Sequence, residues 1–236
     1  MSDARRATAT PREATFFDVD GTLVQTTIAH YYAYFRRARM ARPIAGIWYA
    51  CFLMKCGYFM ILDRINRSMM NRVFYRGYRG LPVASTKAQS LQCYKDVILP
   101  RQFDQAPKTI EQHRQAGRRI VLVTGSIDFI IRPLAEALNV DAVLAARLVE
   151  RDGCFTGALD GPPIGEQEKA VCIRTYAAQH NIDLNRSYGY GDSIADLPML
   201  EAVANAAVVN PDKALAAIAR DRGWPIHRWT VGGRRG

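Results

Sequence analysis

The sequence predicts an α/β protein with a Rossmann-like, three-layer core, a mostly parallel sheet and an inserted helical cap. From about residue 105 onward, short apolar runs typical of strands alternate with helical segments, as in parallel sheets covered by helices. Between the first apolar run and residue 100, the spacing is helical. We therefore expect a core over 14–24 and 101–224, a cap over 25–100, a disordered tail over 1–13 and a C-terminal tail over 225–236.

The first strand is predicted over residues 14–17, an apolar run that ends at Asp18 and Asp20 and is followed by Gly21. Alternate residues of a strand share a face, so the two carboxylates lie on the same side. Carboxylates this close repel each other unless a cation lies between them, which suggests a Mg²⁺ site. A solvated strand end is the plainer alternative, because Asp-Gly is common in turns. A Ca²⁺-binding loop would need Glu at its twelfth position, where this chain has Ala29.

The predicted cap is helical outside its most apolar part. Residues 28–42 carry apolar and aromatic side chains at helical spacing, and residues 63–79 form a basic helical stretch. Residues 83–99 predict a further helix that ends at Pro100, since proline lacks the N–H that would continue it.

One stretch of the cap, residues 43–62, is long and apolar enough to be considered as a membrane span. Lys55 and Gly57 lie in its middle, and the sequence contains no second candidate span. A pair of cap helices is therefore the favoured interpretation. Shallow association with a membrane surface stays open, so peripheral membrane contact is an alternative that we do not favour.

The second half of the chain predicts the rest of the sheet and its helices. Strands are expected over 119–126, 142–144, 187–192 and 206–210, helices over 107–116, 129–138, 165–179, 197–203 and 212–222, and a hairpin over 148–155 that turns at Asp152-Gly153. In parallel sheets, ligands bind beyond the carboxyl ends of the strands. The strands that end at Asp18, Thr124 and Asp192 therefore point into one crevice.

The composition limits the partners and the compartment. The formal net charge of +10 suits an anionic partner, but the basic residues are dispersed without an aromatic–basic motif, so we expect no nucleic acid. The five cysteines are scattered without Cys-x-x-Cys spacing, which indicates reduced thiols rather than disulfides or zinc. No apolar run precedes Phe16, so no secretory signal is predicted and a cytoplasmic protein is expected.

Four sequence features occur in a fixed order: Asp18 with Asp20, then Thr124-Gly125, then Lys169, then Gly191-Asp192-Ser193-x-x-Asp196. In this order they resemble the haloacid dehalogenase superfamily of aspartate-nucleophile phosphatases, over about residues 14–210. The insertion between the first two features and the sequence from Gly189 to Leu200 resemble subfamily IB, the phosphoserine phosphatase-like group.

This resemblance implies Mg²⁺-dependent hydrolysis of a small-molecule phosphomonoester through an aspartyl phosphate. It assigns Asp18 as the nucleophile, and Asp20 as the acid that protonates the leaving alkoxide and then as the base that activates water. The implied Mg²⁺ ligands are Asp18, the backbone carbonyl of Asp20, and Asp192. Asp196 is implied as a further ligand or as the group that orients metal-bound water.

The resemblance also implies a phosphate-binding set. The Thr124 hydroxyl and the Gly125 N–H would bind phosphate oxygens, while Lys169 would offset negative charge. Each has a plainer interpretation: Thr124 could simply end a strand, Lys169 could be solvated, and Ser126 could cap the next helix. Asp196 could likewise cap the helix that follows it. The four histidines show no pairing, and we assign them no chemistry.

Two positions depart from the phosphoserine phosphatase pattern. Thr27, nine residues after Asp18, stands where those enzymes carry the Glu that holds the substrate ammonium group, and Ala195 replaces an Asn. The cap is also rich in aromatic residues. A phosphomonoester with some apolar character, such as a lipid phosphate, is therefore our hypothesis, with core packing as the plainer explanation of the aromatics.

Two other functions stay open on the sequence. A phosphotransferase would pass the phosphoryl group to a second hydroxyl instead of water, and no residue pattern separates it from a hydrolase. A non-catalytic phosphate-binding or membrane-surface module is disfavoured because both Asp18 and Asp20 are present. The oligomeric state is not predicted.

Overall fold

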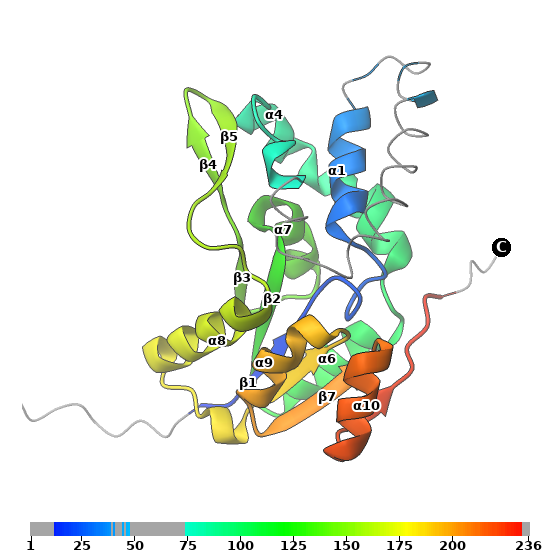
Figure 1. Ribbon diagram of the computed structural model, residues 1–236, viewed down its shortest axis with the longest axis vertical. Coiled ribbons are helices and arrows are strands. Elements are labelled where there is room, and N and C mark those ends of the chain that lie inside the picture. The colour runs from blue at the N-terminus through cyan, green and yellow to red at the C-terminus, as the bar shows by residue number, and fades with distance from the viewer. Residues whose placement is uncertain (1–11, 39, 41–43, 45, 48–73, 233–236) are drawn as a thin grey trace, which may run out of the picture.

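The computed structural model describes residues 12–38, 40, 44, 46, 47 and 74–232 (Figure 1). The cap helix pair expected over 43–62 and most of the basic stretch expected over 63–79 lie outside the described residues, as do the first eleven residues of the N-terminal tail. Within the described part of the chain, every helix is too short or too polar to cross a bilayer.

The core is one six-stranded sheet in which every neighbouring pair of strands is parallel. From edge to edge the strands are β3 (Ala142–Ala146), β2 (Arg119–Ile127), β1 (Ala14–Phe17), β6 (Tyr188–Gly191), β7 (Asn205–Val209) and β8 (Ile226–His227). The predicted α/β class is therefore confirmed. β1 lies in the middle, and all four of its residues are buried, as its apolar sequence requires.

Helices cover both faces of this sheet, as Figure 1 shows. Helices α8 (Glu166–His180), α9 (Leu197–Glu201) and α10 (Lys213–Asp221) pack on one face, and α6 (Gln105–Gln115) and α7 (Asp128–Ala137) on the other. The alternation of β1 divides the two cores: Phe16 packs toward α8, and Phe17 packs toward α6. The three-layer prediction holds.

The described part of the cap includes α1 (Ile28–Arg37), α4 (Val83–Ala88), α5 (Ser90–Cys93), a π-helical turn η1 (Tyr94–Ile98) and a 3₁₀ turn η2 (Leu99–Arg101). The single helix predicted over 83–99 was wrong. The α-helical pattern breaks at Gln89, whose N–H donates to the Thr86 carbonyl at 3.2 Å, three residues back instead of four. The chain then continues past Pro100 through the π-helical turn η1, which is wider than an α-helix, and the 3₁₀ turn η2, which is tighter.

The two chain segments that join cap to core run side by side. Val24 and Gln102 form an antiparallel bridge, with Gln25 N–H donating to the Arg101 carbonyl at 2.7 Å and Phe103 N–H donating to the Leu23 carbonyl at 3.0 Å. The cap therefore enters and leaves the core at one place.

The predicted hairpin is present as β4 (Leu148–Arg151) and β5 (Cys154–Leu159). Its turn residues Asp152 and Gly153 have φ of 50° and 72°, the left-handed pair expected of a two-residue hairpin turn. Backbone hydrogen bonds tie the hairpin to the cap, since Phe155 N–H donates to the Leu81 carbonyl at 2.9 Å and Gly80 N–H donates to the Phe155 carbonyl at 2.8 Å.

The C-terminal tail expected over 225–236 needs correction over part of its length. β8 adds a strand beside β7, and Trp229 beyond it is buried. The side chain of Asn210 holds this segment, because its amide donates to the Trp229 carbonyl and its oxygen accepts the Trp229 N–H, both at 3.0 Å. Arg12 and Glu13, expected within the N-terminal tail, are also attached, through a bridge to Ile182 and an ion pair with Arg118.

Candidate active site

Acidic and basic side chains gather at the carboxyl edge of the sheet. Asp18 directly follows β1, Asp192 directly follows β6, and Asp196 ends the 3₁₀ turn η4 (Ile194–Asp196). Lys169 reaches the same place from the first turns of α8. The predicted convergence of separate motifs at one edge is what the parallel topology produces.

Within the described residues, Asp18, Asp192 and Asp196 each offer one carboxylate oxygen, and these atoms lie within 4.8 Å of one another. Lys169 lies against two of them: its Nζ donates to Asp18 Oδ1 at 2.5 Å and to Asp196 Oδ1 at 2.6 Å. Both ion pairs are buried. The ammonium therefore offsets part of the repulsion within the carboxylate cluster.

Burial and charge act unequally on this cluster. Burial raises the pKa of Asp18 to about 7, although Lys169 lowers it. Burial also acts to raise the pKa of Asp196, but Lys169 and the N–H groups of Ser193 and Asp192 outweigh it, and the pKa is lowered. Burial acts to lower the pKa of Lys169, but Asp18 and Asp196 outweigh it and the pKa is raised. Lys169 and Asp196 are therefore charged, and the charge of Asp18 is the one that depends most on its neighbours.

The difference between the two aspartates lies in their second oxygens. Asp196 Oδ2 accepts hydrogen bonds from the N–H groups of Asp192 and Ser193 and from the Ser193 hydroxyl, at 3.0–3.2 Å. Asp18 Oδ2 is buried and has no hydrogen-bond partner. A buried carboxylate oxygen without a partner is costly, and a hard divalent cation held by oxygen ligands would satisfy it. The donor set therefore fits Mg²⁺.

Gly21 allows Asp192 to approach the site. Its φ is +100°, and a Cβ placed there would lie 2.2 Å from Asp192 Oδ2. The next residue, Thr22, donates its hydroxyl to Asp192 Oδ1 at 3.2 Å. The turn after β1 thus leaves room for the carboxylate and also orients it.

The Asp20 side chain is directed away from the carboxylate cluster, toward hydroxyl groups. Asp20 Oδ1 accepts from Thr26 Oγ1 and from the Tyr31 hydroxyl, each at 2.8 Å. Asp20 Oδ2 accepts from Ser126 Oγ at 2.6 Å, with Thr124 Oγ1 farther away at 3.4 Å. The Asp20 carboxylate is therefore not part of the cluster of Asp18, Asp192 and Asp196. The metal-ligand role predicted for Asp20 concerns its backbone carbonyl and not this side chain.

The predicted phosphate-binding residues, Thr124 and Gly125, lie near the C-terminal end of β2. Thr124 is buried and its hydroxyl accepts the Ser126 N–H at 2.9 Å. Gly125 has its backbone close to another segment, because an added Cβ would lie 2.7 Å from the Ile164 carbonyl oxygen. Its own carbonyl accepts the Tyr75 hydroxyl at 2.5 Å. A cap tyrosine therefore contacts this segment directly.

Several hydroxyl groups at the site were not predicted as functional residues; they are Thr22, Thr26, Tyr31, Tyr75 and Ser126. Ser126 was considered only as a cap for the next helix, but the residue at that cap is Ile127. Tyr31 is one of the aromatic positions of the helix predicted over residues 28–42. Nothing in the sequence distinguishes a tyrosine whose ring is packed from one whose hydroxyl also reaches a carboxylate.

Thr27 is exposed and caps α1, with its hydroxyl 2.9 Å from His30 Nδ1 and its N–H donating to the same nitrogen at 3.1 Å. Thr27, at the position where phosphoserine phosphatases bind the ammonium group of their substrate, therefore serves here as the N-cap of α1.

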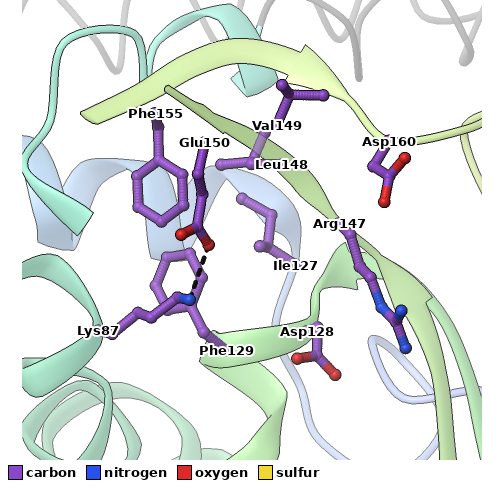
Figure 2. Close-up of a pocket in the computed structure, with 10 residues that line it drawn as sticks. All are labelled: Lys87, Ile127, Asp128, Phe129, Arg147, Leu148, Val149, Glu150, Phe155 and Asp160. Carbon is purple, nitrogen blue, oxygen red and sulfur yellow. Dashed lines mark hydrogen bonds and ion pairs between the residues drawn. The ribbon is translucent and has the colours of Figure 1, made fainter. Parts of the chain in front are cut away.

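A cavity of about 470 Å³ lies apart from this cluster, between the hairpin and the start of α7 (Figure 2). Phe129 and Phe155 stack along its wall with ring centroids 5.4 Å apart. Lys87 and Glu150 form an exposed ion pair across it at 2.7 Å. None of the clustered carboxylates lines it.

The amino-acid sequence of the chain is similar to one protein family and to several known proteins. The family model described as haloacid dehalogenase-like hydrolase matches residues 15–201. A Streptomyces azureus protein named "Inhibition of morphological differentiation protein" is 36% identical over 92% of this chain and 78% of its own length. A probable phosphatase of Mycobacterium tuberculosis is 35% identical over 91% and 75%. A phosphoserine phosphatase of the same organism is 30% identical over 92% and 71%.

Solved structures share the fold. A Bordetella pertussis protein of unknown function superposes with a TM-score of 0.79 at 28% identity, covering 92% of this chain and 99% of its own. A phosphoserine phosphatase solved as a phospho-aspartyl intermediate analogue superposes with a TM-score of 0.66 at 20% identity, covering 93% and 94%. At that lower identity the likeness concerns the fold alone.

Proposed function

The chain belongs to the haloacid dehalogenase-like hydrolase family and is a phosphatase, and we propose that it hydrolyses a small phosphomonoester through an aspartyl phosphate on Asp18. The observation that carries the proposal is the environment of Asp18. One of its oxygens is paired with Lys169 at 2.5 Å, and the other is buried without a partner at the carboxyl edge of the sheet. Lys169 fixes the position of this carboxylate, which suits a nucleophile, and the unpartnered oxygen is the one that a bound cation would satisfy.

The first step would transfer the phosphoryl group to the protein. Asp18 attacks phosphorus, the bond from phosphorus to the ester oxygen breaks, and Asp20 gives its proton to that oxygen so that an alcohol leaves. In the second step Asp20 takes a proton from water, the hydroxide attacks phosphorus, and inorganic phosphate and free Asp18 result. Lys169 offsets charge on Asp18 and on the phosphoryl oxygens in both steps.

The proposed metal ligands are Asp18, Asp192 and the backbone carbonyl of Asp20, with Asp196 as a further ligand or as the group that orients metal-bound water. The unpartnered Asp18 oxygen and the close spacing of Asp18, Asp192 and Asp196 support this set. When bound, Mg²⁺ would neutralise charge between the carboxylates and the phosphate. The Thr124 hydroxyl and Gly125 N–H are the proposed phosphate contacts.

The substrate is proposed to be a small phosphorylated metabolite that needs no carboxylate at position 27. The Thr27 side chain is neutral and occupied in capping α1, so it cannot pair with an ammonium group as a Glu would. The apolar-substrate hypothesis loses part of its support, because Tyr31 and Phe35 are both buried in the core cluster. Four other aromatic residues of the cap lie outside the described residues: Trp48, Tyr49, Phe52 and Phe59.

A panel of phosphomonoesters assayed with Mg²⁺ and with a chelator tests the proposal. Asp18→Asn serves as the control, since it keeps the shape of the side chain but removes the nucleophile. We expect Mg²⁺-dependent release of phosphate from at least one ester and its loss in the variant. Full activity in Asp18→Asn would contradict the assignment of the nucleophile.

A further inference from the structure

The carboxylate of Asp20 is held from two sides by different parts of the molecule. Ser126, on a core strand, donates to Oδ2 at 2.6 Å. Thr26, on the segment leading into the cap, and Tyr31, on cap helix α1, donate to Oδ1 at 2.8 Å each. The two hydroxyl oxygens are also 2.8 Å from each other, so they form a closed triangle with Asp20 Oδ1.

Both hydroxyl groups are enclosed. Tyr31 and Thr26 are 1% and 3% exposed, so water does not compete for their contacts. Burial and the nearby Asp20 raise the pKa of Tyr31 well above its usual range, so its hydroxyl keeps its proton. A hydroxyl can donate to a carboxylate and accept from a carboxylic acid, so the pair can serve Asp20 both before and after it transfers a proton.

We propose that Tyr31, together with Thr26, is a positioning residue that fixes the Asp20 carboxyl for proton delivery to the leaving-group oxygen. The inference rests on the proposed function, because it concerns the acid of that reaction. Since Tyr31 belongs to the cap and Ser126 to the core, the full set of contacts exists only while α1 is seated on the core.

A Tyr31 that positions Asp20 affects substrates differently from a Tyr31 that only stabilises the fold. The leaving group of an alkyl phosphate is an alkoxide, which needs the proton of Asp20. The leaving group of p-nitrophenyl phosphate is a stable p-nitrophenolate, which departs without that proton. The quantity kcat/KM reports steps through the first phosphoryl transfer, where this proton is delivered. Misplacing Asp20 should therefore reduce kcat/KM for an alkyl phosphate far more than for the aryl ester.

The experiment measures kcat/KM for the best alkyl phosphate of the panel and for p-nitrophenyl phosphate in Tyr31→Phe and Thr26→Val. Tyr75→Phe is the matched control, because it removes another buried cap hydroxyl whose partner is the Gly125 carbonyl rather than Asp20. In Tyr31→Phe we expect the ratio of alkyl to aryl kcat/KM to fall about 10-fold, a fraction of what general acid catalysis contributes. In Tyr75→Phe the two substrates should change by the same factor.

The outcomes separate the inference from the function on which it rests. If Asp20→Asn lowers the alkyl-to-aryl ratio but Tyr31→Phe and Thr26→Val scale both substrates alike, the positioning role is overturned while the phosphatase mechanism stands. If the wild-type protein hydrolyses neither substrate class, the proposed function itself fails. Should Tyr31→Phe not fold, the ratio in Thr26→Val decides, and a fall confined to the alkyl ester supports the proposal.

Discussion

Lys169 is the buried cation on which the carboxylate cluster depends. Its ammonium is shared between Asp18 and Asp196, and the side chains of all three are at most 7% exposed. Removing one partner of a buried ion pair leaves the other charge uncompensated. Here two carboxylates would be left to repel each other.

We therefore expect Lys169→Met to lower the free energy of unfolding by about 3–5 kcal/mol in the absence of metal and to lower kcat at least about 100-fold. Mg²⁺ should raise the melting temperature of the variant more than that of the wild type, because the carboxylates then have no other cation. Thermal melts with Mg²⁺ and with a chelator measure this. Equal shifts in both proteins would contradict it.

Gly21 gives a second prediction at the residue scale. Alanine there would strain a φ of +100° and displace Asp192, whereas Gly223, with φ of +67°, has nothing within 4 Å of its added Cβ. Gly21→Ala should therefore weaken Mg²⁺ binding about 10-fold or more, while Gly223→Ala should affect only stability. Calorimetric titration with Mg²⁺ distinguishes them. Unchanged affinity in Gly21→Ala would show that Asp192 is not a ligand.

At this scale the sequence identifies charged residues better than hydroxyl groups. Asp18 and Asp192 could be selected because each follows a predicted strand at the same edge of the sheet, and Lys169 because its place in the order of motifs resembles the family pattern. Thr26, Tyr31 and Ser126 could not, because Ser, Thr and Tyr have many ordinary roles, and their hydroxyl partners depend on how the cap is seated.

At the scale of elements, α6 is docked on the sheet by His113. Its Nε2 lies 2.9 Å from the Tyr190 hydroxyl, and its Nδ1 lies 3.3 Å from Arg118 Nη1. Glu13 contacts the same guanidinium at 3.1 Å. Burial, and then Arg118, lower the pKa of His113 to about 4. The neutral ring is therefore the form that packs.

The sign of the pH dependence follows from linkage. The folded-state pKa of about 4 lies below the ordinary value of 6.5, so the unfolded chain binds more protons between these values, and stability falls as the pH falls through this window. We expect the free energy of unfolding to drop between pH 6.5 and 4.5, and to drop less in His113→Gln. Urea unfolding at several pH values measures both slopes. Parallel slopes would contradict the account.

Prediction of elements succeeded where turn chemistry decides and failed where the kind of helical turn changes along a segment. The hairpin at Asp152-Gly153 was correct because that turn requires left-handed residues. The single helix over 83–99 was wrong because the hydrogen bonding changes to a three-residue bond at Gln89 and then to a π-helical turn and a 3₁₀ turn from Tyr94 onward. The spacing of apolar residues does not distinguish these kinds of helical turn.

At the scale of the whole molecule, the C-terminal segment closes the core. Trp229 is 8% exposed and its ring stacks near Tyr190, with centroids 6.4 Å apart. Trp229→Ala should lower the free energy of unfolding by about 3–5 kcal/mol, while kcat/KM changes little because the site lies on other strand ends. Urea unfolding and steady-state kinetics measure the two quantities. Unaltered stability would mean that the segment does not contribute to the core.

The parallel sheet was predictable for the whole molecule because alternating strands and helices permit few other arrangements. β8 was not, since two residues, Ile226 and His227, give no periodic signal. The seating of the cap on the core was not predictable either. It depends on contacts such as Phe35 with Phe129, whose rings are 5.7 Å apart and which come from distant parts of the chain.

The central claim is that Asp18 carries the phosphoryl group during turnover, and trapping that species tests it most directly. The enzyme is mixed with its best substrate, quenched in acid, reduced with borohydride and digested, and residues 13–36 are sequenced by mass spectrometry. Borohydride reduces an aspartyl phosphate to homoserine, so we predict homoserine at position 18 only when substrate is present. Unmodified Asp18 together with a modified Asp20, or no modification during rapid turnover, would contradict the account.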